Sequence, residues 1–137
     1  HKFILHIQDM DDWIGLKPAT SDIFDIYAEP LLFAIPSRRE GFPNALAEAL
    51  IHGLPSADFA YVAGVADLIA ASGGGWLAPG LDTEKSLAEK LDRAMTNAPK
   101  RERRTRLGVA GMATFALKKQ FDHWAVLLDD VVAERKQ

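Results

Sequence analysis

The chain has 137 residues, of which 48% are apolar, so it can form one domain with a buried core. Its formal net charge of −3 argues against a dedicated nucleic-acid binder, and the absence of cysteine excludes disulfides. No apolar run approaches the roughly 20 residues that cross a bilayer.

Apolar runs that read as buried strands alternate with helical patterns through the first part of the chain. Strands are expected at residues 3–7, 31–35, 58–62 and 76–78, with a stub at 13–15, and the clearest is 31–35. Helices are expected at residues 22–27, 44–52 and 64–71. Strands that alternate with helices form parallel sheets with helical crossovers. The sequence therefore predicts one Rossmann-like three-layer α/β/α domain with a mainly parallel sheet over residues 1–137.

Three further helices are expected, at residues 83–96, 100–117 and 121–133. The first carries an apolar stripe of Leu87, Leu91, Ala94 and Met95. The last has apolar side chains at three- and four-residue spacing, which predicts a stripe packed in the core: Phe121, Trp124, Leu128, Val131 and Val132. Residues 100–106 carry five positive charges and one negative charge. We interpret this segment as an exposed helical face, with contact to anionic lipid as the alternative.

The run at residues 36–48 carries the clearest functional signal. It leaves the carboxyl end of the best predicted strand, where open parallel sheets bind ligands, and leads into a helix. Glu40 lies on the loop and Glu48 about one turn inside the helix, with the Gly41 and Phe42 amides at or near the helix N-terminus. Such a terminus has unpaired donors and partial positive charge, which suit a phosphate. Because carboxylates accept hydrogen bonds from hydroxyls, the pattern predicts a nucleotide-sugar site.

This run resembles the C-terminal, donor-binding half of a family 4 retaining glycosyltransferase with the GT-B fold. The family's signature places Pro-Ser ahead of Glu-Gly-Phe-Pro, with a second Glu eight residues after the first. It stands here as Pro36-Ser37-Arg38-Arg39-Glu40-Gly41-Phe42-Pro43-Asn44, closing at Glu48. The likeness continues through Gly64-Val65-Ala66-Asp67 and Gly75-Trp76-Leu77-Ala78-Pro79, and it covers roughly residues 13–130.

The resemblance implies an enzyme, a hexosyltransferase that moves a sugar from a nucleotide-diphosphate-sugar to an acceptor glycan or lipid-linked sugar. The implied pathway is polysaccharide or cell-envelope glycan biosynthesis. Glu40 is implied as the catalytic residue that holds donor-sugar hydroxyls, and Glu48 as the ribose contact. The other implied donor-binding residues are Ser37, Gly41, Phe42, Pro43 and Asn44. No metal or other cofactor is expected, and the expected location is cytoplasmic, with peripheral contact at the inner membrane face.

Several departures from the family keep a second interpretation open. The family's phosphate-binding Arg and Lys and its acceptor-binding N-terminal domain lie upstream of the matched segment. In relatives the final helix reaches toward that domain, so the alternative for the stripe at residues 121–132 is that part of it is exposed in a fragment. The chain begins without Met or a signal-peptide pattern, so we expect a fragment that does not turn over alone. Arg38 and Arg39 are interpreted as solvated, although a guanidinium fork could replace the absent cations. The alternative function is a non-catalytic interaction or scaffold domain of the same fold.

Overall fold

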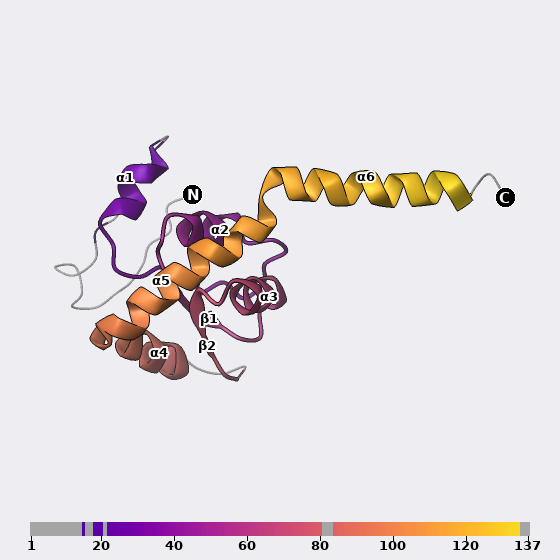
Figure 1. Ribbon diagram of the computed structural model, residues 1–137. Coiled ribbons are helices and arrows are strands. Elements are labelled where there is room, and N and C mark those ends of the chain that lie inside the picture. Colours follow the sequence, from indigo (N-terminus) through magenta and orange to yellow (C-terminus); the bar gives the residue numbers. More distant parts are fainter. Residues whose placement is uncertain (1–14, 16–17, 21, 81–83, 135–137) are drawn as a thin grey trace.

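The computed structural model describes Gly15 and residues 18–20, 22–80 and 84–134. The predicted strand at residues 3–7 and most of the predicted stub at 13–15 lie outside these described residues. Helices and strands follow one another in the order that Figure 1 labels. They are α1 (Ile23–Ala28), α2 (Asn44–Ile51), β1 (Ser56–Phe59), α3 (Ala63–Ser72), β2 (Gly75–Ala78), α4 (Glu84–Thr96), α5 (Ala98–Met112), the 3₁₀ turn η1 (Ala113–Phe115) and α6 (Leu117–Glu134).

A parallel sheet forms the centre of the domain, as predicted. β1 pairs with β2 in parallel, from Ser56 opposite Gly75 to Phe59 opposite Ala78. α3 is the crossover between them, and α4 packs against both strands. The domain is therefore the mixed α/β, Rossmann-like fold that the alternating pattern indicated.

The expected strand at residues 31–35 is reduced to a single bridge, which corrects the sequence prediction. Phe33 pairs with Ser56 in parallel, donating its N–H to the Pro55 carbonyl at 3.0 Å. The next donor along, the N–H of Ile35, goes instead to the Asp58 carboxylate at 2.6 Å. The side chain of Asp58 thus replaces a rung of the ladder, and regular pairing stops there.

β1 also differs from its prediction, because it starts at Ser56 and ends at Phe59 where residues 58–62 were expected. Ser56 and Asp58 are polar, yet both are fully buried in this strand. The Ser56 hydroxyl lies within hydrogen-bonding distance of the Phe33 carbonyl, at 3.2 Å, and of the Asp58 carboxylate. These partners offset part of the cost of burying the two polar groups, so a strand forms where the sequence looked too polar for one.

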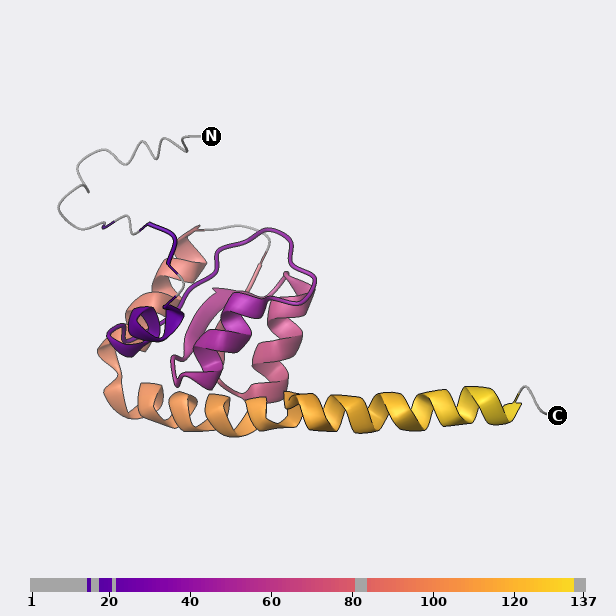
Figure 2. The same ribbon diagram turned by 90° about the horizontal axis from the view of Figure 1, so that it is seen from above.

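The core lies between the sheet and the helices that cover it. α5 packs closely against α2 and α3, and Figure 2 shows it running along one side of the domain. The approach is backbone to backbone at Gly111, where an added Cβ would lie 2.4 Å from the Ser72 Cα. Large apolar side chains that are almost completely buried in this core include Leu46, Leu50, Val65, Leu68 and Ile69.

The C-terminal helices depart most from their predicted bounds. One helix was expected over residues 100–117, but α5 ends at Met112 and η1 carries the chain to Phe115. Ala116 then adopts an extended ψ of 136°, which separates α5 from α6. Phe115 packs against the core and lies 6.4 Å from the Phe42 ring. A tertiary contact therefore sets this break.

The apolar stripe on α6 is exposed, so its predicted place in the core is wrong. Phe121, Trp124 and Leu128 are 67%, 59% and 58% exposed, and Val131 and Val132 are exposed as well. Figures 1 and 2 both show α6 extending away from the rest of the domain. Helical spacing shows that a face is apolar, but it does not identify what covers that face.

α4 fits its predicted stripe better than α6 does. Leu87 and Ala94 are buried and Leu91 is partly buried against the core, whereas Met95 is 55% exposed.

Among the described residues, no helix combines the length and the apolar character needed to cross a membrane.

Candidate functional site

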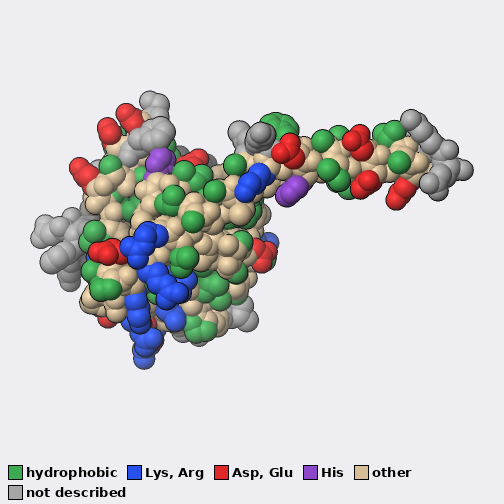
Figure 3. All heavy atoms as spheres, in the orientation of Figure 1, with side chains coloured by type: hydrophobic (Ala, Val, Ile, Leu, Met, Phe, Trp, Pro, Cys, Tyr) green, Lys and Arg blue, Asp and Glu red, His purple; other side chains and the backbone are tan. Residues whose placement is uncertain are grey.

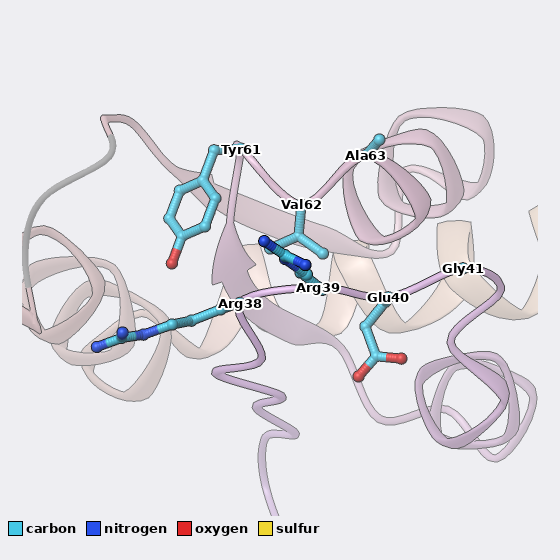
Figure 4. Close-up of a pocket in the computed structure, with 7 residues that line it drawn as sticks. All are labelled: Arg38, Arg39, Glu40, Gly41, Tyr61, Val62 and Ala63. Atoms are coloured by element: carbon cyan, nitrogen blue, oxygen red, sulfur yellow. The ribbon is translucent and has the colours of Figure 1, made fainter.

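Two loops at the carboxyl end of the sheet border an open cavity of about 480 Å³. The first loop follows the extended segment around Phe33, and the second joins β1 to α3. Figure 4 shows the residues that line the cavity, which are Arg38, Arg39, Glu40, Gly41, Tyr61, Val62 and Ala63. Carboxyl ends of parallel strands are the usual ligand-binding edge of such sheets. The cavity therefore lies at the edge of the sheet where the sequence predicts the site, and its use as a ligand site stays a prediction.

The two loops meet at a glycine pair. A Cβ added to Gly64 would lie only 1.8 Å from the Gly41 carbonyl oxygen, so the backbone of α3 touches the backbone of the Glu40 loop directly. This contact brings Ala63, the first residue of α3, to the cavity wall. The N-terminus of α3 has no side-chain cap. Its partial positive charge is therefore available to an anion in the cavity.

Asp58 determines where the first loop leaves the sheet. Its carboxylate is fully buried, and it accepts hydrogen bonds from the Ile35 N–H and the Ser56 hydroxyl. Ile35 lies three residues before Arg38, so this bond ties the start of the loop to β1. Burial raises the pKa of Asp58 to about 6, because desolvation outweighs the stabilising effect of the two hydrogen bonds.

Replacing Asp58 with asparagine should remove a pH-dependent loss of stability. The folded state holds the Asp58 proton up to about pH 6, whereas the reference value for a free side chain is 3.8. The stabilisation that protonated Asp58 contributes is therefore fully present below pH 3.8, and it is lost as the pH rises through about 6. Across this pH range, the raised pKa of Asp58 lowers the free energy of unfolding of the parent protein by about 3 kcal/mol. Urea unfolding should show Asp58→Asn gaining that amount relative to the parent between pH 4 and pH 7.

Asn can still accept the Ile35 bond, so Asp58→Asn should fold normally. Asp58→Ala serves as the contrasting variant, because it leaves the Ile35 N–H without this partner and should be about 1–3 kcal/mol less stable than Asp58→Asn at every pH. A stability difference between Asp58→Asn and the parent that does not change with pH would contradict the raised pKa.

The structure puts the predicted site residues in several places, and only two of them line the cavity. Glu40 and Gly41 line the cavity. Phe42 is 55% exposed and lines a separate apolar cavity of about 450 Å³ with Phe115. Pro43 is buried as the N-cap of α2. Asn44 starts that helix with its N–H bonded to the Phe42 carbonyl, and Ser37 donates its N–H to the Ile35 carbonyl.

Glu48 lies on α2 and contacts a different group. Its carboxylate lies near the hydroxyl of Tyr27. Burial is the main cause that raises the pKa of Tyr27, and the negative charge of Glu48 and a hydrogen bond to Glu48 raise it further. The Tyr27 hydroxyl also donates to the Ala45 carbonyl at 3.3 Å, and its ring stacks on His52. The structure thus puts Glu48 beside Tyr27, and the residues that line the cavity with Glu40 are others.

Sequence reasoning missed half of the cavity wall. Tyr61, Val62 and Ala63 follow β1 as the Glu40 loop follows its own strand segment, so the rule about carboxyl ends could have found them. The helix N-terminus at the cavity is also that of α3, whereas α2 was expected. Arg38 and Arg39 are exposed and also line the cavity. In Figure 4, Arg39 points toward Val62 and Glu40 leaves the loop on the other side.

Comparison with known proteins agrees with this geometry. The sequence model of the family described as glycosyl transferases group 1 matches residues 4–110. The chain belongs to the group 1 glycosyltransferases. An uncharacterized glycosyltransferase of Haemophilus influenzae is 29% identical to it over 89 residues, which is 65% of this chain and 25% of that protein. The chain thus spans about a quarter of the length of this curated relative.

The match places the cavity within the group 1 glycosyltransferase domain, since Arg38 to Ala63 all lie inside residues 4–110. In the part of the chain that the structure describes, no group of three His, Asp or Glu side chains could hold a metal ion. The metal-free reaction implied by the resemblance stays a prediction.

Proposed function

We propose that this domain is the donor-binding half of a retaining, family 4 glycosyltransferase that uses a nucleotide-diphosphate-sugar. The observation that carries the proposal is the composition of the cavity wall, which combines one acidic residue, Glu40, with two arginines, Arg38 and Arg39, and with the uncapped start of α3. Cationic groups and helix N-termini suit a diphosphate, and a carboxylate suits sugar hydroxyls.

The chemistry proposed for the cavity divides between these groups. Arg38, Arg39 and the α3 amides would stabilise the departing diphosphate, whose negative charge grows as the sugar–phosphate bond breaks. Glu40 would hold hydroxyls of the sugar near its anomeric carbon, where positive charge develops. Glu48 remains the proposed ribose contact. Its place on α2 beside Tyr27 requires the nucleoside to extend from the cavity along that helix.

The complete enzyme is proposed to need more than this domain. The chain spans 25% of its Haemophilus relative, and the α6 stripe exposes a continuous apolar face that a further domain could cover. We propose that such a domain binds the acceptor, a glycan or a lipid-linked sugar, and that the domain described above does not turn over alone. Polysaccharide or cell-envelope glycan biosynthesis on the cytoplasmic side of the membrane is the proposed setting, without a metal cofactor.

Calorimetric titration with UDP, GDP and ADP tests the donor site. One of the three should bind the complete gene product, and replacing both Arg38 and Arg39 with glutamine should weaken that binding at least about tenfold. The matched control replaces Arg103 and Arg106, two exposed arginines of α5 that are not among the residues lining the cavity, and should change the affinity little. No binding of any of the three at millimolar concentration would remove the support for a donor site here.

A further inference from the structure

A third cavity, of about 260 Å³, lies where α4 meets α5. It is lined by Trp76, Lys90, Arg93, Thr96, Asn97 and Lys100. Trp76 is next to the first residue of β2, and α4 runs back from the carboxyl ends of the strands, so its last turns lie at their amino ends. This cavity is therefore at the opposite edge of the sheet from the Glu40 cavity, and the two share no lining residue.

The cations around this edge fall into two groups. Arg101 and Arg104 are partly buried and stabilise the fold. Arg101 donates hydrogen bonds to the Ala94 and Met95 carbonyls. Arg104 donates to the Gly73 carbonyl, and its guanidinium carbon lies 5.6 Å from the centre of the Trp76 ring. The interpretation of residues 100–106 as a wholly solvated face is wrong for these two.

Lys90, Arg93 and Lys100 form the other group, and they line the cavity. In the described ranges, none of these three side chains has a carboxylate partner or a hydrogen bond. The 3.0 Å bond from Lys100 to the Asn97 amide oxygen comes from its main-chain N–H. Figure 3 shows the Lys and Arg side chains gathered in one band over α4 and α5. Three cations that surround one hollow repel each other, and a bound anion would relieve that repulsion.

One neutral side chain of the wall, Asn97, also favours an anion, whereas the hydroxyl proton of Thr96 is used within α4. The amide oxygen of Asn97 is occupied as the cap of α5, so its NH₂ group remains as a donor. The Thr96 hydroxyl donates to the Asp92 carbonyl at 2.7 Å. The wall therefore presents ammonium, guanidinium and amide donors next to the partly buried ring of Trp76. We propose that this cavity binds the phosphate group of a ligand, either a free phosphate compound or an anionic lipid headgroup, at a site separate from the donor cavity.

Neutralising the cavity tests this proposal in the complete gene product. The cavity variant carries Lys90→Gln, Arg93→Gln and Lys100→Gln, and the matched control carries Lys85→Gln, Arg103→Gln and Arg106→Gln. Both remove three positive charges from exposed or partly exposed positions of α4 and α5, so their net charges are equal. A third protein with Arg38→Gln and Arg39→Gln removes cations from the donor cavity only. The probes are inorganic phosphate and pyrophosphate by calorimetry, and vesicles of phosphatidylglycerol and phosphatidylcholine by sedimentation.

We expect one probe class to bind the parent protein, the control and the donor-cavity variant, and to bind the cavity variant at least about tenfold more weakly. Binding of phosphate or pyrophosphate in this pattern identifies a free phosphate ligand. Binding of the anionic vesicles alone, absent with pure phosphatidylcholine, identifies a lipid headgroup. Failure of both probes to bind the parent, or an equal loss in the charge-matched control, would overturn the site.

Discussion

Replacing Glu40 with glutamine in the complete gene product should lower the rate of sugar transfer about 10²–10³-fold, the usual cost of losing one oriented electrostatic contact in a transition state. Glutamine keeps the shape of the side chain and one acceptor oxygen but loses the negative charge. The charge matters most in the transition state, because the sugar ring becomes positive as the diphosphate leaves. Glu40 is partly exposed on the loop at the cavity, so its replacement should leave the free energy of unfolding nearly unchanged.

The rate of transfer and the thermal unfolding curve should be measured together. Glu102→Gln provides the control, since Glu102 is an exposed carboxylate on α5 and is not among the cavity's lining residues. It should change neither quantity. If Glu40→Gln lowered stability as much as activity, Glu40 would have a structural role. That result would favour the interpretation of this domain as a non-catalytic scaffold. An unchanged rate would remove Glu40 from the mechanism.

Replacing Gly64 with alanine should destabilise the protein by about 3 kcal/mol, the upper end of the usual range for overpacking. The new Cβ would lie 1.8 Å from the Gly41 carbonyl oxygen and 3.2 Å from that of Glu40, and neither is a flexible side-chain end that could swing away. The start of α3 and the Glu40 loop would have to separate. We therefore expect loss of donor binding along with the loss of stability, measured by urea unfolding and by nucleotide titration.

Gly41→Ala is the matched control on the other side of the same contact. A Cβ added to Gly41 meets nothing within 4 Å, and its φ is not positive. This variant should keep its stability, or gain up to about 1 kcal/mol through the less flexible unfolded chain. Equal stability of Gly64→Ala and Gly41→Ala would show that the two loops are not in the close contact described here.

The fold class and the edge of the sheet that holds the site could be predicted from local patterns. Helices α2 and α3 and strand β2 lie close to their expected bounds, because apolar periodicity and turn residues act within a few positions of one another. β1 was misplaced for a different reason. Ser56 and Asp58 look like loop residues in the sequence, and only their partners at Phe33 and Ile35 allow them to be buried.

The site was predicted in part, again for a physical reason. The motif indicated Glu40 and Gly41, but it carries no information about Tyr61 or Ala63, which come from the next strand and helix. Glu48 shares the motif with Glu40, yet α2 directs it to Tyr27. Spacing along a helix relates residues of one element, whereas a cavity wall is assembled from several.

What the sequence determined by itself is therefore the kind of domain and one candidate site loop: an alternating α/β chain with an acidic, glycine-containing turn after a strand. Tertiary structure alone decided which second loop completes the cavity, which cations remain unpaired, and that the α6 stripe is exposed. The reason is that periodicity and turn chemistry are local. The partner that covers an apolar face or satisfies a buried carboxylate lies far along the chain or outside it.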